Sequence, residues 1–363
     1  MRPLGEAVAR AEVKMERDLE RARAFAEALE DLSLSQAELA KTDLVSSDLV
    51  RANLSFANLR GVNLSQADLS HADLSFANLR EANLSQADLS HADLGHADLR
   101  GSDLSKANLD FANLSFAKLS NSTLEGTSFV RAYMSEADLR HANLSEADLS
   151  SADLSNADLS HADLSDASLF RADLGSAILF KAKLARANLH KAVLTDANLR
   201  RADMSGCDIS YADCMEADCR WANLSNANAE GVSFHSSQLD GADLTKANLS
   251  GANLGEARLV GADLSDADLS RAELYGSDLT RAMLCGAKLV QANLELAEVS
   301  GSNFSNADLV GAVMTYFDHE DIVLTGATMP NGETYGYYED LLLSLDEELA
   351  VVDGELTVVE VKT

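Results

Sequence analysis

Apolar residues recur at every fifth position along most of the chain. From Leu39 to Met314, every residue whose number ends in 4 or 9 is uncharged, with no insertion or deletion. Of these 56 positions 45 hold leucine, and the others are Phe129, Met134, Met204, Ile209, Cys214, Cys219, Ala229, Phe234, Val299, Phe304 and Met314. A helix repeats every 3.6 residues and a flat strand every 2.0, so a period of five predicts neither.

The other positions of the pentapeptide are also patterned. Numbers ending in 2 or 7 are nearly all alanine, and numbers ending in 3 or 8 are mostly Asp or Asn. The exceptions in the alanine column are small or compact, such as Ser102, Ser122, Thr127, Cys207 and Val232. Two inward positions in five require a corner in each pentapeptide, so four corners close a coil of 20 residues. Successive coils then stack about 4.8 Å apart, as β-strands do, and stacking alone creates the core.

The A(D/N)LXX pattern, seen in Ala52-Asn53-Leu54 and Ala67-Asp68-Leu69, resembles the pentapeptide-repeat family. The resemblance implies an all-β solenoid, a right-handed quadrilateral parallel β-helix. We place this β-helix at residues 32–331. We expect an N-terminal amphipathic capping helix at residues 1–31 and a short acidic α/β tail at residues 332–363, which caps the repeats or forms a dimer.

Both ends carry patterns of their own. Residues 5–31 have apolar residues at three- and four-residue spacing, which predicts a helix laid across the exposed end of the solenoid. A coiled-coil dimer or a membrane-surface helix is the weaker alternative, because Asp18 falls at a core-like position and the polar face is not especially basic. Pro330-Asn331-Gly332 predicts the end of the repeats. Residues 338–349 then look helical, and residues 350–359 predict a hairpin with an Asp-Gly turn.

The charge is strongly acidic. The chain has 59 acidic and 29 basic residues, a formal net charge of −30. The negative electrostatic potential disfavours direct binding of nucleic acid or an anionic membrane and favours basic partners. Solubility or adaptation to salt explains the negative charge equally well. No signal-peptide core and no apolar run of 18 residues is present, so we expect a cytoplasmic location.

Catalytic chemistry is not evident in the sequence. There is no glycine-rich phosphate loop and no HExxH motif. Ser, His and Asp occur at the outward-facing positions of the repeat. We therefore expect no enzyme and no catalytic, cofactor or metal site; stacked histidines would be the alternative for a metal. Cys207, Cys214 and Cys219 fall at inward columns and are interpreted as small core residues, whereas Cys285 falls at an outward one.

Outward residues 20 apart should stack in columns. One column holds Phe56, Phe76, His96 and Phe116, and a neighbouring one holds Arg60, Arg80, Arg100, Arg140, Arg200 and Arg220. Two more hold His141, His161, Lys181, Arg201 and Trp221, and Arg51, His71, His91, Arg131, Arg171, Lys191 and Arg271. We favour ion pairs of the arginines with Asp98, Asp138 and Asp218. The alternative is a ridge that binds a partner, with Phe56, Phe76, Phe116, Arg60, Arg80 and Arg100 as candidates, because aligned exposed aromatics often mark contacts.

These observations favour a non-catalytic protein–protein interaction scaffold with an unidentified protein partner. The alternative is a DNA mimic that binds a type II topoisomerase, DNA gyrase or topoisomerase IV. The resemblance implies it, because the family includes proteins that occupy the DNA site of gyrase and protect against quinolones. The uninterrupted repeat and the basic columns argue against the mimic. A homodimer through a terminal cap is a further expectation.

Overall fold

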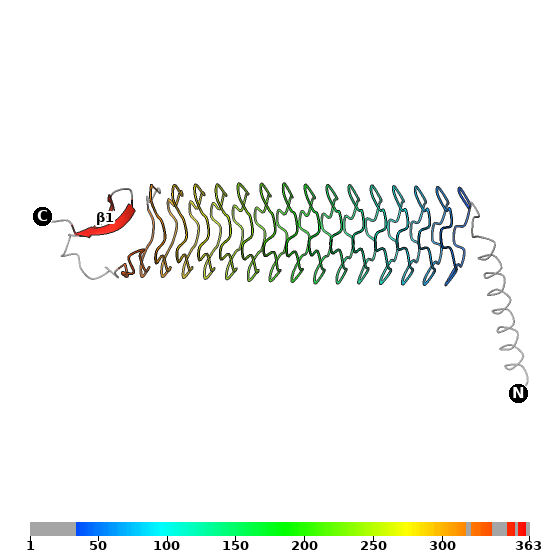
Figure 1. Ribbon diagram of the computed structural model, residues 1–363, viewed down its shortest axis with the longest axis horizontal. Helices are drawn as coiled ribbons and strands as arrows, with labels where there is room; N and C mark the ends of the chain where they lie inside the picture. The colour runs from blue at the N-terminus through cyan, green and yellow to red at the C-terminus, as the bar shows by residue number, and fades with distance from the viewer. Residues whose placement is uncertain (1–33, 317–320, 336–346, 353–354, 361–363) are drawn as a thin grey trace, which may run out of the picture. The chain divides into compact units, whose positions relative to one another are not determined.

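A computed structural model describes residues 34–316, 321–335, 347–352 and 355–360 of the 363-residue chain. The chain divides into two compact units, Met1–Asp158 and Leu159–Thr363, which are described separately. The described repeats of each unit form stacked coils (Figure 1). Within these described ranges no helix has the length and apolar character needed to span a bilayer.

Coils pair with the next coil in parallel, 20 residues apart. Asp68 pairs with Asp88 in the first unit, and Asp243 pairs with Asp263 in the second. Each pentapeptide makes one such bridge, at the Asp or Asn position. The adjacent leucine N–H also donates to the following coil, as from Leu74 to the carbonyl of Asp93 at 2.7 Å. Four short bridges per coil give the four-sided parallel β-helix that the family resemblance implies.

The corners use left-handed backbone. From Gln36 to Gly326, every residue whose number ends in 1 or 6 has φ between 53° and 73°. The following alanine N–H closes the turn onto the leucine carbonyl three residues earlier, as from Ala87 to Leu84 at 3.0 Å. A positive φ at the third residue is the feature of type II turns, which usually place Gly or Asn there. Most corners here carry other residues, so the stacked bonds outweigh the local strain.

The Asp or Asn residue of the pentapeptide forms a hydrogen bond that stabilises the corner. Its Oδ1 accepts the backbone N–H two residues later, as Asp73 does from Ser75 and Asn83 does from Ser85, both at 3.0 Å. This side chain satisfies a donor that the turn would leave unpaired, an Asx arrangement. Asp and Asn supply the same acceptor atom, so this bond does not require the negative charge.

The core consists of the leucine and alanine columns. The predicted burial of Leu144 and Leu249 is confirmed, because neither side chain is exposed to solvent (0%). Ala229 and Phe234, a small and a large residue five positions apart, are both fully buried, as volume compensation in a close-packed core requires. Ser122 is accommodated in the alanine column because its hydroxyl donates to the carbonyl of Leu119 at 2.6 Å.

Three cysteines belong to this core. Cys207, Cys214 and Cys219 are buried and unpaired, which confirms their interpretation as core residues. Burial raises the pKa of the Cys207 thiol to about 12 and raises those of the other two as well, so all three stay protonated and unreactive at neutral pH. Cys285 is half-buried.

The tail contains one antiparallel pair, β1 (Glu347–Val352) and β2 (Glu355–Glu360). Val352 pairs with Glu355 and Glu347 with Glu360, so two residues connect the strands and the predicted hairpin is confirmed. The predicted helix over 338–349 is wrong in its last three residues, because Glu347–Leu349 belong to β1; cross-strand pairing prevailed over a helix-like apolar spacing. The rest of that segment, and the predicted N-terminal helix, lie outside the described residues. Capping and dimer formation by either end stay predictions.

Candidate interaction surfaces

An aromatic ladder stands on one corner of the first unit. Phe56, Phe76, His96 and Phe116 stack in order, with ring centroids 4.9, 4.7 and 4.8 Å apart and rings within 10° of parallel. The coil spacing is about 4.8 Å, so the backbone itself sets this stacking distance. The three phenylalanines remain 57%, 50% and 43% exposed. The structure thus brings together the predicted aromatic strip as a continuous aromatic edge, with His96 between the phenylalanines.

A second ladder occupies the neighbouring corner, five residues earlier in each coil. His71, His91 and Phe111 stack at 4.8 and 4.9 Å, and the guanidinium of Arg131 lies 5.7 Å from the Phe111 ring. These histidines belong to the column predicted to be basic. Phe111 was not predicted, although its 20-residue spacing from His91 was the available signal. The two ladders border one face, whose width is under about 17 Å because only five residues cross it.

The arginine row, Arg60, Arg80 and Arg100, borders the next face on the other side of the aromatic ladder. Arg60 pairs with Glu81 at 2.9 Å, and Arg100 pairs with Asp98 at 2.5 Å. Arg80 makes no ion pair with a described residue, and its Nε is buried without a hydrogen-bond partner among them. The predicted pairing of this column with Asp98, Asp138 and Asp218 is confirmed. Two of the three arginine candidates therefore already have partners within the chain.

The Asp138–Arg140 pair makes a testable contribution to stability. The side-chain hydrogen bond from Arg140 at 2.7 Å holds the pKa of Asp138 below its ordinary value of 3.8, against the opposing effect of burial. A depressed carboxyl pKa stabilises the fold above that ordinary value, and the stabilisation disappears as the pH falls through the folded-state pKa. Asp138→Asn keeps the Oδ1 acceptor, so it should cost only about 0.2–1 kcal/mol at neutral pH.

Thermal unfolding of wild type and Asp138→Asn checks this expectation. The difference between the two melting temperatures should be present at neutral pH and should shrink below pH 3.8. Asp158, 3.6 Å from Arg140, stays in place in both proteins. A difference that persists unchanged in acid would assign the effect to packing rather than charge.

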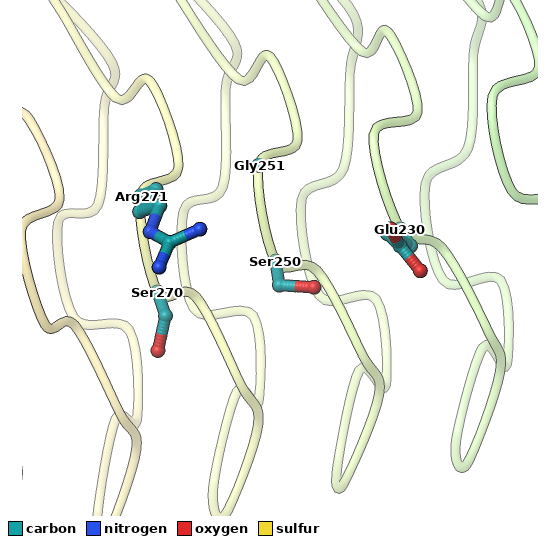
Figure 2. Close-up of a pocket in the computed structure, with 5 residues that line it drawn as sticks. All are labelled: Glu230, Ser250, Gly251, Ser270 and Arg271. Carbon is teal, nitrogen blue, oxygen red and sulfur yellow. The ribbon is translucent and has the colours of Figure 1, made fainter.

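A shallow notch of about 320 Å³ lies on the second unit, lined by Glu230, Ser250, Gly251, Ser270 and Arg271. Figure 2 shows the guanidinium of Arg271 and the carboxylate of Glu230 on different coils, with Ser250 between them. Glu230 accepts a hydrogen bond from the Tyr211 hydroxyl at 2.6 Å. This notch was not predicted from the sequence; the available signal was a pair of glycines, Gly231 and Gly251, in one column.

The notch has a limited chemistry. Its groups are one carboxylate, one guanidinium and two hydroxyls, and Ser250 Oγ donates to Asn248 at 2.7 Å rather than to a base. This arrangement lacks the nucleophile–base contact of covalent catalysis. Among the described residues no group of three or more His, Cys, Asp and Glu is arranged to hold a metal ion.

Trp221 lies against a glycine of the following coil. A Cβ added at Gly241 would meet Trp221 Cδ1 at 2.7 Å, closer than real Cβ contacts. Gly241→Ala should therefore displace the indole and shift its emission to longer wavelength, because the ring gains solvent. Gly251→Ala is the matched control: its φ of +66° is close to the +63° of Gly241, but an added Cβ there meets nothing within 4 Å.

The emission spectrum and the melting temperature are measured for both variants and for wild type. Trp221 is the only tryptophan, so emission reports on this position alone. Both alanines strain a left-handed corner, and only the Gly241 variant should change the spectrum. Equal spectra for the two variants would contradict the packing described here.

The family model for pentapeptide repeats matches the chain eight times, at residues 29–66, 67–105, 107–145, 147–184, 172–210, 212–251, 247–284 and 277–315. The chain belongs to the pentapeptide-repeat family. The expected pentapeptide-repeat solenoid, with parallel bridges between coils 20 residues apart, is thereby confirmed.

Similar solved structures come from bacteria and a plant. HetL, a pentapeptide repeat protein involved in heterocyst differentiation regulation in the cyanobacterium Nostoc, is 31% identical over 76% of this chain and 92% of its own, with a TM-score of 0.24. QnrB1, a plasmid-mediated fluoroquinolone resistance protein, is 19% identical over 63% and 90%, with a TM-score of 0.21. A pentapeptide repeat protein of the Arabidopsis thaliana thylakoid lumen is 27% identical over 30% and 69%, with a TM-score of 0.17. No curated protein matches the chain.

Proposed function

We propose that this pentapeptide-repeat protein is a non-catalytic protein-interaction scaffold, with the aromatic ladder and the arginine row of the first unit as its contact surface. The observation that carries the proposal is the continuous exposed stack of Phe56, Phe76, His96 and Phe116. Single exposed apolar residues are normal on soluble proteins, whereas contiguous apolar patches often mark contact sites.

The rigidity of the ladder supports the proposal. Phe76 and His96 each lie between the rings of two adjacent coils, and Phe56 and Phe116 each stack on one ring. Each stands on a corner with a left-handed φ, 57° for Phe56 and 58° for Phe76. Side chains that are already ordered lose little conformational entropy when a partner covers them. Arg80 is the one arginine of this row without an ion pair to a described residue, although its charge helps to lower the pKa of Asp98; it offers a guanidinium beside the ladder to a partner carboxylate.

Affinity capture with purified immobilised protein tests the contact surface. Wild type is compared with Phe56→Ser/Phe76→Ser/Phe116→Ser and with the control Tyr133→Ser/Tyr275→Ser/Leu296→Ser, which removes similarly exposed side chains outside the ladder. We expect wild type and control to retain the same bound protein and the ladder variant to lose it. Circular dichroism establishes that all three are folded. Retention by the ladder variant would contradict the proposed surface.

The second candidate function, the topoisomerase-binding DNA mimic, is favoured by one observation. The corner bond from Asp or Asn needs only an oxygen acceptor, yet the chain carries 59 acidic residues. The fold therefore does not account for the charge. A mimic binds through summed negative charge, so its affinity for a topoisomerase should fall steeply with salt.

Gyrase supercoiling with purified protein over a salt series separates the two functions. Inhibition or protection at low salt, lost as salt rises and unaffected by the three Phe→Ser changes, would favour the mimic and contradict the scaffold. No effect on gyrase, together with capture that depends on the ladder, would contradict the mimic.

A further inference from the structure

A basic surface interrupts the acidic character of the second unit. We define the basic corner as residues 178–183, 198–203 and 218–223, which pair in register on three successive coils. It holds two acids, Asp203 and Asp218, and five cations, Lys181, Lys183, Arg200, Arg201 and Arg220. This corner is therefore positive in a chain whose formal net charge is −30.

The acids of the basic corner are already engaged. Asp218 lies 2.6 Å from Arg220 and only 3.8 Å from Arg200 Nε, so one carboxylate faces two guanidinium groups. Asp203 accepts hydrogen bonds from the Ser205 backbone at 3.2 Å and from the Asn223 side chain at 3.1 Å.

Two cations have no acidic partner. Lys183 pairs with Asp163 at 2.9 Å, whereas Lys181 and Arg201 form no ion pair with any described residue, and both are exposed. Together with the incompletely paired Arg200, they leave uncompensated positive charge at the surface.

Aromatic rings hold these cations in place. The guanidinium groups of Arg200 and Arg201 each lie 5.5 Å from the Trp221 ring, and the Lys181 ammonium lies 5.2 Å from the Phe180 ring. Trp221 itself is half exposed. Cation–π contact orients the charged groups without neutralising them, so they remain available to an anion. Tryptophan and arginine are also the residue types most enriched at binding hot spots.

We propose that the basic corner docks a short acidic segment of a protein partner. Three coils about 4.8 Å apart offer cations over roughly 10 Å, the length of three to four extended residues, so two or three carboxylates fit. A long polyanion fits less well, because it would continue over flanking coils that carry Asp163 and Asp243 and would meet the negative field of the whole chain. The proposal is independent of the aromatic ladder in the first unit.

Titration with hexaglutamate tests the proposal. Trp221 is the sole tryptophan, so its emission reports directly on occupation of the basic corner. We expect a saturable change that weakens with salt, because the attraction is screened. Lys181→Ser/Arg201→Ser should weaken binding about tenfold, because two contacts between exposed charges are lost together. Anisotropy of a fluorescein-labelled peptide provides a second readout that is free of changes in the indole environment.

Arg271→Ser is the matched control. Arg271 also stands on a left-handed corner, with φ of 60° against 57° for Arg201. Arg271 takes part in none of the ion pairs between described residues. Its loss should leave affinity for hexaglutamate unchanged. Absence of saturable binding, or equal weakening in the control, would overturn the proposal. Tighter binding of an oligothymidylate of equal charge would show that the basic corner binds nucleic acid instead of an acidic segment. Trp221 emission that changes with protein concentration alone would show that the corner contacts a second copy of the chain.

Discussion

Replacing Leu144 with aspartate is expected to destroy the local fold of the first unit. The Leu144 side chain is fully buried between neighbouring coils, where a carboxylate finds no water. Burial of an unpaired charge costs several kcal/mol beyond the lost apolar contacts. Leu144→Ala, which only leaves a cavity, should cost about 2–5 kcal/mol. Thermal unfolding followed by circular dichroism measures both variants.

Asn143→Asp is the control for this pair, because it adds the same carboxylate one residue away. Asn143 Oδ1 accepts from the Ser145 backbone at 3.1 Å, and an aspartate oxygen supplies the same acceptor. Outward aspartates at the equivalent position of other coils, such as Asp73, make this bond already. The control should change stability by less than about 0.5 kcal/mol. If Leu144→Asp melts like Asn143→Asp, the assignment of inward and outward columns is wrong.

The period of five was sufficient to predict the core. A position that is leucine in nearly every repeat can only face a dry interior, so Leu144 and Leu249 could be assigned without coordinates. The hairpin was similarly accessible through its turn residues. Glu347–Leu349 were misassigned because three residues carry too little periodicity to separate helix from strand.

The surface could be predicted only in part. Equal spacing identified which residues share a column, and so it found Phe56 and Phe76. It also found the pairing of the arginine column with Asp98, Asp138 and Asp218. It could not show that Arg60 pairs with Glu81, because Glu81 belongs to a different column of the next coil. The notch beside Arg271 forms because Gly251 has no side chain and because the neighbouring side chains leave the space open. The conformations of these side chains do not follow from residue type alone.

The two candidate surfaces differ in what holds them in place. On the first unit, backbone spacing alone stacks the rings, so a ladder forms wherever aromatic residues recur every 20 positions. On the second unit, Trp221 lies against Gly241, and the arginines in turn lie against Trp221. Removal of one aromatic side chain should therefore affect the two surfaces differently. Removing one phenylalanine shortens a ladder, whereas removing Trp221 releases both guanidinium groups.

Proline at a corner should be nearly as disruptive as charge in the core. Gln86 has a φ of 59°, and its N–H donates to the carbonyl of Ser105 at 2.9 Å. Proline fixes φ near −65° and has no N–H, so Gln86→Pro removes the coil-to-coil bond and forbids the turn. We expect a loss of about 3 kcal/mol or more. The measurement is the free energy of unfolding in urea.

Gln86→Gly makes the opposite test at the same corner. Glycine adopts positive φ without steric cost, which relieves about 1–2 kcal/mol, while greater freedom in the unfolded chain offsets about 0.4–1 kcal/mol. The glycine variant should therefore be equally stable or up to about 1.6 kcal/mol more stable than wild type. A corner that tolerated proline, or that lost stability with glycine, would show that the left-handed turn is not what closes each pentapeptide. In that case the hydrogen bonds between stacked coils would have to close each coil without the left-handed turn. The recurrence of the left-handed φ at every corner from Gln36 to Gly326 argues against this.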